Sequence, residues 1–274
     1  MPSYLVTGAS RGLGYAIVKV LASDPANTVL ALARNKQAAE DRLASDKISN
    51  VHVFAADVTD ETALKAAARQ ARSILGGKGL DVLINNAAYV SEKTALTSLH
   101  EYENDLQTVF EDTQRSVEVN VYGPLKVIFA FLDLIRQGQL KKVVAISSGM
   151  GDINMINEIK LSNAAPYAIS KGALNVLMAK LNASYADSGI LFMSLCPGRV
   201  DTLEGDIPEL TQADLTRLQG ILAKFQENAD GKYVASAPED GARNVLAAID
   251  RQSLAGGFGG SFLSHNGTTK WTAP

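Results

Sequence analysis

Short apolar runs alternate with longer amphipathic stretches along the whole 274-residue sequence. The short runs are continuously apolar, which is typical of strands buried on both faces of a parallel sheet. Helices that cross between such strands produce a doubly wound α/β fold with right-handed connections. We therefore predict a parallel seven-stranded sheet flanked by helices. The predicted strands are Tyr4–Thr7, Thr28–Ala33, Val51–Ala55, Val82–Ile84, Lys142–Ser147, Ile190–Cys196 and Gly260–Leu263, and the helices include Leu13–Ser23, Asp60–Leu75 and Gln107–Arg136.

The sequence contains no internal repeat and no interdomain linker, so we predict a single domain over residues 1–274. Two stretches interrupt the alternation. Ala88–Gln107 is polar and longer than a strand-to-helix connection needs. Residues 201–235 carry a helix of their own, and Thr211 and Asp214 have capping-box spacing at its expected start.

The apolar stripe of that extra helix has two interpretations, because it either packs against the body of the protein or covers the substrate. The segment directly follows the carboxyl end of a strand, where open α/β sheets bind ligands. We therefore predict a small substrate lid over residues 201–235. The stripe consists of Leu215, Leu218, Leu222 and Phe225.

Composition argues against several classes of protein. A net charge of -3 does not favour binding to nucleic acid or to an anionic membrane surface. Cys196 is the only cysteine, and the three histidines are scattered, so neither an intrachain disulfide nor a metal site is expected. No apolar run reaches the roughly 18 residues of a membrane span. A cytoplasmic enzyme is the expectation.

A glycine-rich turn follows the first apolar run. The segment Thr7-Gly8-Ala9-Ser10-Arg11-Gly12-Leu13-Gly14 leads directly into an amphipathic helix. Glycines allow a sharp turn and a close approach of the backbone to a pyrophosphate, and the helix amino terminus favours the phosphate charge. Any tight turn between a strand and a helix also uses glycine, but the position of this loop favours nucleotide binding.

The end of the second predicted strand discriminates between cofactors. An NAD-binding unit carries an acidic residue there, whereas arginine suits the 2′-phosphate of NADP. In this sequence the strand ends at Ala33 and continues with Arg34, and Arg11 lies in the glycine loop. The alternative is that both arginines are solvated surface residues. Two arginines at independently expected places predict NADP(H).

Tyr167 and Lys171 form the sharpest chemical signal. Their i, i+4 spacing puts both side chains on one face of a helix. A neighbouring ammonium lowers a tyrosine pKa from about 10 and so allows proton transfer near neutral pH. A solvated helix face is the alternative. Ser148 supports the chemical interpretation, because it follows a strand at the same sheet edge, whereas Ser147 alternates to the other face.

These motifs together resemble the classical short-chain dehydrogenase/reductase family, and in particular its carbonyl-reductase and sniffer branches. The family pattern Thr-Gly-x-x-x-Gly-x-Gly fits the glycine loop, and the other motifs follow in the family's order. Ala88 departs from the family, which has glycine after Asn-Asn-Ala. The matching motifs after the loop are Asn85-Asn86-Ala87, Asn120 with Gly123, Ser148, Tyr167-x-x-x-Lys171 and Pro197-Gly198.

The resemblance implies a Rossmann fold and hydride transfer between NADP(H) and a carbonyl compound or secondary alcohol. It assigns catalysis to Asn120, Ser148, Tyr167 and Lys171, with Tyr167 as the proton donor or acceptor and Asn120 holding a water near Lys171. It also gives Asp57 a contact with adenine, although Asp57 could instead cap a helix. The cofactor-binding residues that it implies are Gly8, Ser10, Arg11, Gly12, Leu13, Gly14, Arg34, Asp57, Val58, Asn86, Ala87, Tyr167, Lys171, Pro197, Gly198, Val200 and Thr202.

Three further expectations remain open at this level. Met150, Met155 and Ile156 precede Tyr167 and favour an apolar ketone or aldehyde as substrate. Family members pair through the helices carrying Asn120 and Tyr167, which implies a homodimer or homotetramer. A non-redox enzyme such as a dehydratase, or a regulator that senses NADP, could use the same fold.

Overall fold

The computed structural model describes residues 1–202 and 210–271. Within these residues, seven strands form one sheet in the order β3-β2-β1-β4-β5-β6-β7, and every neighbouring pair is parallel. This confirms the predicted doubly wound α/β fold. The strands are β1 (Ser3–Thr7), β2 (Thr28–Ala33), β3 (Val51–Ala55), β4 (Val82–Asn85), β5 (Lys142–Ile146), β6 (Leu191–Cys196) and β7 (Phe262–Ser264).

Two predicted elements differ from the structure by more than one residue at an end. The last strand was expected over Gly260–Leu263, but Gly260 has a φ of +74°, so the extended backbone begins only at Phe262. The long helix expected over Gln107–Arg136 is interrupted by a single π turn at Glu118–Tyr122. Such turns often mark functional sites, and this one contains Asn120.

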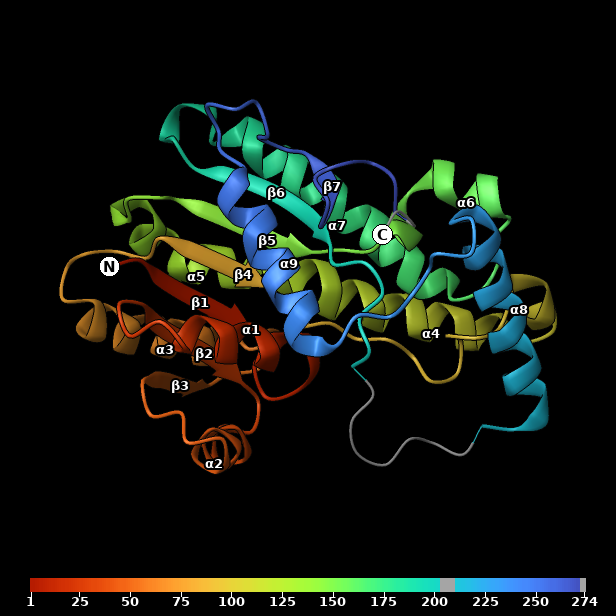
Figure 1. Cartoon of the computed structure of the whole chain (residues 1–274), viewed down its shortest axis with the longest axis horizontal. Helices are drawn as coiled ribbons and strands as arrows, with labels where there is room; N and C mark the ends of the chain where they lie inside the picture. Colours follow the sequence, from red (N-terminus) through yellow and green to blue (C-terminus); the bar gives the residue numbers. More distant parts are fainter. Residues whose placement is uncertain (203–209, 272–274) are drawn as a thin grey trace.

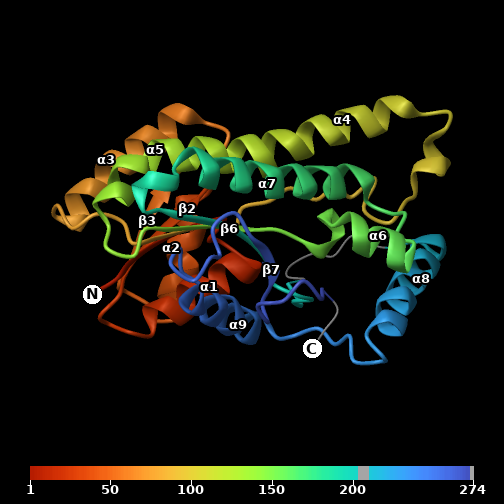
Figure 2. The ribbon, with the colours of Figure 1, turned by 90° about the horizontal axis from the view of Figure 1, so that it is seen from above.

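Helices cover both faces of the sheet (Figure 2). Alternation along β2 sends Leu30 and Leu32 into the apolar cluster of one face, and Val29 and Ala31 into that of the other. The first face carries α3 (Glu61–Leu75), α4 (Leu106–Val117), α5 (Gly123–Gln137) and α7 (Ala165–Ser184), and the second carries α1 (Gly12–Ala22), α2 (Lys36–Ser45) and α9 (Pro238–Arg251).

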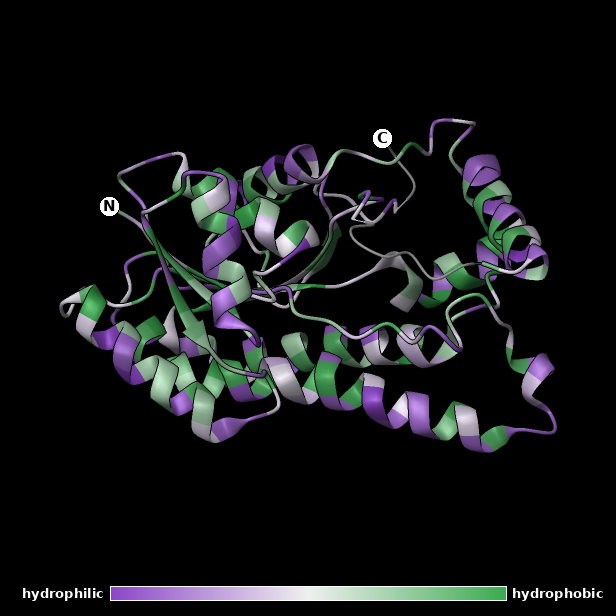
Figure 3. Cartoon of the chain, turned by 90° about the horizontal axis from the view of Figure 1, so that it is seen from below, coloured by the Kyte–Doolittle hydropathy of each residue, from purple (hydrophilic) through white to green (hydrophobic). Residues whose placement is uncertain are grey.

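Hydrophobic residues concentrate in the central strands, whereas the helices present a mixture of hydrophobic and polar residues (Figure 3). This is the distribution expected for strands buried on both faces. None of the helices in the described parts of the chain combines the length and the apolar character that a membrane span requires.

Two further helices lie beyond the carboxyl ends of the strands, on the right in Figure 1. They are α6 (Ile153–Ile159) and α8 (Gln212–Asn228). The capping box predicted at the start of α8 is present, with Thr211 and Asp214 bonded reciprocally. Phe225 of α8 is buried in a third apolar cluster with Met155 and Ile159 of α6.

Candidate active site

The glycine loop between β1 and α1 brings its own backbone close to the backbone at the end of β4. Gly8 and Gly12 have φ values of +67° and +56°, which favour glycine. A side-chain carbon at Gly8 would lie 2.8 Å from the Ala87 Cα, and one at Gly14 would overlap the Gly8 carbonyl. The loop therefore leaves no room for side chains against β4 and leaves the α1 amino terminus open to a phosphate.

Thr7 and Asn86 join the glycine loop to the end of β4. The Thr7 hydroxyl accepts hydrogen bonds from the backbone N–H groups of Asn86 and Ala87, each at 3.0 Å. The Asn86 side-chain amide donates to the carbonyls of Thr7 at 3.0 Å and Gly8 at 3.3 Å. Asn86 thus supports the loop that would hold the cofactor, as does Thr7, the first residue of the glycine motif, to which the sequence analysis gave no role of its own.

The edge beside β2 and β3 carries the residues expected to select the cofactor. Arg11 and Arg34 are both exposed at this edge. Burial raises the pKa of Asp57, but hydrogen bonds from Thr59 and the charges of Arg34 and another arginine outweigh it, so the net pKa is lowered. Asp57 does not cap the following helix, because Asp60 is the N-cap of α3.

Ser148 and Tyr167 meet at the carboxyl end of β5. Ser148 begins a short 3-10 turn and accepts a hydrogen bond from the Met150 N–H at 3.2 Å. Tyr167 lies in the first turn of α7, and the Ser148 hydroxyl is near enough to its phenol to lower the pKa of Tyr167. Ser147 is buried and its hydroxyl has no partner within the described residues, so the two serines have different surroundings, as strand alternation predicts.

Lys171 lies one helical turn beyond Tyr167, with its Nζ 5.5 Å from the centre of the tyrosine ring. Its ammonium donates to the Ile146 carbonyl at 2.7 Å. Burial lowers the pKa of Lys171 to about 8. Burial also raises the pKa of Tyr167, only partly opposed by the Ser148 hydroxyl. The expected lowering of the tyrosine pKa is therefore not found in this structure, because desolvation dominates.

Asn120 is fully buried in the π turn, and its side chain is held within the protein. Its oxygen accepts from the Tyr89 N–H at 2.7 Å, and its amide donates to the Tyr89 carbonyl and to the Ser170 hydroxyl, both at 2.9 Å. The Ser170 hydroxyl donates in turn to the Tyr167 carbonyl at 2.7 Å. Asn120 is thus linked to the helix of Tyr167 through Ser170, which sequence reasoning missed.

The segment after β6 returns to the glycine loop. Gly198 has a φ of +75°, and a side-chain carbon there would lie 2.7 Å from the His265 ring. Thr202 lies against Gly12, since a side-chain carbon at Gly12 would be 3.3 Å from the Thr202 Cβ. The structure therefore brings Thr202, at the end of the Pro197–Thr202 segment, beside the amino terminus of α1.

An apolar cluster lies beside Ser148 and is built from segments that are distant in sequence. Trp271 is buried there against Gly149 and stacks on Phe262 with ring centroids 4.1 Å apart. The Cys196 thiol accepts a hydrogen bond from the Gly149 N–H at 3.3 Å. Sequence reasoning missed Trp271, because no local pattern places it beside the end of β5.

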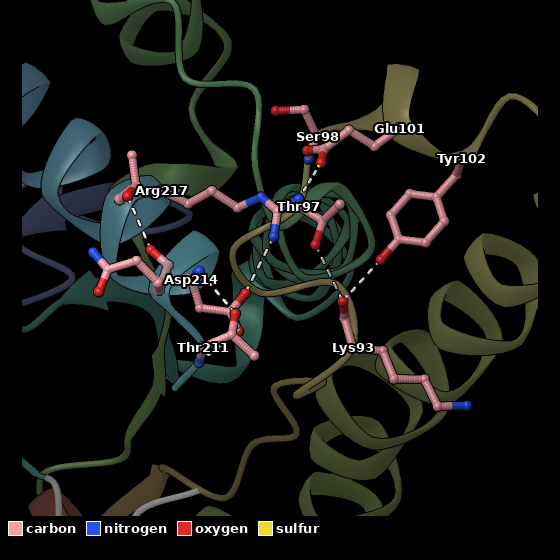
Figure 4. Close-up of polar contacts among 10 residues, drawn as sticks. Lys93, Thr97, Ser98, Glu101, Tyr102, Thr211, Asp214 and Arg217 are labelled. Carbon is pink, nitrogen blue, oxygen red and sulfur yellow. Dashed lines mark hydrogen bonds and ion pairs between the residues drawn. The ribbon is translucent and has the colours of Figure 1, made fainter. Parts of the chain in front are cut away.

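The two stretches that interrupt the sequence alternation contact each other through an ion pair (Figure 4). Arg217 of α8 binds Glu101 at 2.5 Å and Asp214 at 3.2 Å. The neighbouring Ser98 hydroxyl contacts that of Ser162, shortly before α7, at 2.7 Å. The Ala88–Gln107 segment therefore connects α8 to the helix that carries Tyr167.

Comparison with known sequences agrees with this arrangement. Residues 3–206 match the family model described as short chain dehydrogenase. The chain is 41% identical to short chain dehydrogenase virK of Hypocrea virens over 274 residues, which covers 99% of this chain and all of the relative. It is 43% identical to short-chain dehydrogenase/reductase AacuF of Aspergillus aculeatus over 272 residues, again 99% of this chain and all of the relative.

Solved structures resemble this one over nearly the whole chain. The NADPH-bound carbonyl reductase from chicken fatty liver has a TM-score of 0.75 and 25% identity, with 98% of both chains covered. Carbonyl reductase Sniffer of D. melanogaster has a TM-score of 0.74 at 21% identity, with 98% of both chains covered, and supports the fold alone. The chain belongs to the short-chain dehydrogenase/reductase family of oxidoreductases.

Proposed function

We propose that this protein transfers a hydride between NADP(H) and the carbonyl carbon of an apolar ketone or aldehyde, or the corresponding secondary alcohol. The observation that carries the proposal is that the Ser148 hydroxyl lies near enough to the Tyr167 phenol to lower its pKa, with Lys171 one turn away on the same helix. These groups lie at the carboxyl edge of a doubly wound sheet, where ligands of this fold bind.

The residues of the glycine loop suit a dinucleotide. Gly8, Gly12 and Gly14 leave the backbone exposed to a pyrophosphate where a side chain would collide. Arg11 and Arg34 offer planar donors to a 2′-phosphate, and Ala33 leaves no carboxylate at the end of β2. We therefore assign NADP(H) rather than NAD(H), and place its phosphates at the amino terminus of α1.

Each catalytic side chain has a distinct task. Bound NADPH supplies the hydride. Ser148 donates a hydrogen bond to the substrate oxygen and stabilises the negative charge that develops there. Tyr167 delivers the proton to that oxygen, and Lys171 holds the nicotinamide ribose and stabilises the tyrosinate. Asn120 keeps the helix of Tyr167 in position through Ser170.

The substrate preference follows from the apolar cluster beside Ser148. Met155, Phe225 and Trp271 belong to this cluster, and Met150 and Phe262 pack against it. These side chains favour an apolar substrate body. Residues 201–235 would form the lid, of which the structure describes 201–202 and 210–235.

We further propose that the protein is a homo-oligomer that acts in the cytoplasm. Large apolar side chains on α4, α5 and α7 are exposed, with exposed fractions of 62% for Phe110, 61% for Val176 and 53% for Phe129. A second copy of the chain would remove this surface from water. Light scattering at several concentrations tests the proposal, and a strictly monomeric protein would contradict it.

The cofactor assignment is tested by titrating the purified protein with NADPH and NADH, then adding a panel of apolar ketones and aldehydes. We expect tighter binding of NADPH and its oxidation by at least one carbonyl compound. Arg34→Ala should weaken NADPH binding and leave NADH binding unchanged, whereas Arg136→Ala, which alters an exposed arginine of α5, should change neither. Equal affinity for both cofactors would contradict the assignment.

A further inference from the structure

Arg199 lies in the segment that leaves β6, directly after Gly198. Its backbone is fixed, because its carbonyl accepts hydrogen bonds from the Ser236 N–H at 2.9 Å and from the Ser236 hydroxyl at 3.2 Å. The side chain is half-buried. A guanidinium in such a place has lost part of its hydration and gains from an anionic partner.

Among the residues that the structure describes, Arg199 has no anionic partner. Across residues 1–202 and 210–271, no carboxylate lies within ion-pair distance of its guanidinium, and its one contact is with the ring of Tyr233. Arg217 of α8, by contrast, is held by Glu101 and Asp214. Arg199 is therefore a cation whose two hydrogen-bonding edges remain available to a ligand.

Arg199 forms the outer layer of a three-part stack. Its guanidinium carbon lies 5.6 Å from the centre of the Tyr233 ring, and that ring stacks on Phe225 of α8 with centroids 4.7 Å apart. Stacking on an aromatic face orients the guanidinium plane and restricts its rotamers. The cation is thus positioned beside the apolar cluster that we assign to the substrate.

The stack also lies close to the reacting groups. Cys196, three residues before Arg199, accepts a hydrogen bond from Gly149, the neighbour of Ser148. Tyr233 packs against the apolar cluster that contains Cys196. Tyr233 therefore connects the surroundings of Ser148 with Arg199, on the side of β6 that faces α8.

We propose that Arg199 binds a carboxylate on the substrate, so that the protein acts on apolar carbonyl compounds that carry one carboxylate group. This inference rests on the proposed carbonyl reduction. A planar guanidinium binds a carboxylate through two parallel hydrogen bonds, which fixes the orientation of the substrate as well as adding affinity. The apolar cluster would hold the body of the substrate, and the carbonyl would reach Ser148 and Tyr167.

Matched acids and esters test the proposal. We would measure kcat/KM with NADPH for benzoylformate, para-acetylbenzoate and para-benzoylbenzoate and for their methyl esters. The panel varies the distance between carbonyl and carboxylate. We expect at least one acid to exceed its ester by about 10-fold or more, the size of effect given by a hydrogen bond to a charged group. An equal or lower kcat/KM for every acid would overturn the inference and leave the proposed function intact.

Substitutions of Arg199 then test whether this residue causes the preference for the acid over its ester. Arg199→Met should lower kcat/KM for the preferred acid by about 10-fold or more, leave the ester within about two-fold, and leave NADPH affinity unchanged. Arg199→Lys should recover part of the preference, since it keeps the charge without the planar edge. Arg136→Met, which alters an exposed arginine on α5, is the control. An equal loss for acid and ester, or weaker NADPH binding, would show that Arg199 serves the fold or the cofactor instead.

A direct binding measurement separates this inference from the proposed function. If NADPH binds but neither acid nor ester is reduced, the proposed function fails, and calorimetry of the acids with the NADPH complex decides the role of Arg199. Acid binding that disappears in Arg199→Met supports the carboxylate site. No acid binding to the original protein overturns it.

Discussion

The cofactor side and the substrate side of the site are built in different ways. The cofactor side, formed by the ends of β1, β2 and β4, is held by short hydrogen bonds to the backbone, such as those of Thr7 and Asn86. The substrate side, formed by α6, α8 and the chain terminus, is held by contacts between side chains, such as the Phe262–Trp271 stack and the Arg217–Glu101 pair.

This difference predicts how each side responds to change. Backbone packed on backbone tolerates no added volume, because neither partner can rotate away. Side chains that meet across exposed or partly exposed surfaces lose only the energy of one contact when one of them is altered. We therefore expect substitutions to have large effects on activity or stability at Tyr167, where the two sides meet, and on the cofactor side. Substitutions around α8 should have small effects.

The largest effect is expected at Tyr167, where the two sides meet. Tyr167→Phe removes the hydroxyl that lies near Ser148 and leaves the ring in place. Loss of a general acid should lower kcat by about 100-fold to 10,000-fold, while NADPH binding persists. Single-turnover kinetics with a carbonyl substrate provide the measurement. Full activity of this variant would show that Tyr167 is not the proton donor.

Alanine substitutions at two glycines, one on each side, allow a direct comparison of the two sides. Gly14→Ala would place a methyl group on the Gly8 carbonyl and the Asn86 amide, and should cost about 1–3 kcal/mol of unfolding free energy. Gly220→Ala, within α8 and facing open space, should instead stabilise by about 0.5–1 kcal/mol. Urea unfolding of both variants measures the difference. Equal changes in the unfolding free energy of the two variants would contradict the proposed difference between the two sides.

Lys171 predicts a pH-dependent effect. Its pKa is about 8 in the folded protein and 10.5 in the unfolded chain. Between pH 8 and pH 10.5 the Lys171 amine is therefore mostly protonated in the unfolded chain and mostly neutral in the folded protein. The buried ammonium therefore destabilises the protein fully below pH 8, and this penalty is relieved as pH rises toward 10.5.

Lys171→Met should consequently stabilise the protein without cofactor more at pH 7 than at pH 10, with a change of at most about 1.4 kcal/mol per pH unit. Urea unfolding of both proteins across this range gives the comparison. A stability difference that does not vary with pH would mean that Lys171 keeps an ordinary pKa in the folded state.

The smallest effect is expected where α8 meets the Ala88–Gln107 segment. Arg217→Gln removes the pairs with Glu101 and Asp214, which are partly exposed, and should lower the stability of the protein only slightly. KM should rise by a few-fold with kcat unchanged, and the rise should shrink at high salt. Arg136→Gln is the control, since its pair with Asp133 lies within α5. A large loss of kcat would place Arg217 nearer the chemistry than this account allows.

The same contrast explains which parts could be predicted from the sequence. The strands and the glycine loop were predictable because burial on both faces and close backbone approach demand particular residues in a short span. The π turn at Asn120 was not, because α4 and α5 have one continuous helical pattern and the turn depends on bonds to Tyr89 and Ser170. Trp271 and the Arg217–Glu101 pair depend on tertiary contacts that leave no local pattern.

Isotope transfer tests the central claim most directly. The protein would be mixed with NADPH deuterated at the reactive carbon and with an apolar ketone, and the alcohol would be examined by mass spectrometry. Our account predicts that the deuterium of one face of the nicotinamide appears on the carbinol carbon of the product, and that Tyr167→Phe abolishes this transfer. Deuterium that stays in the cofactor while the substrate is converted would contradict hydride transfer and indicate non-redox chemistry on the same fold.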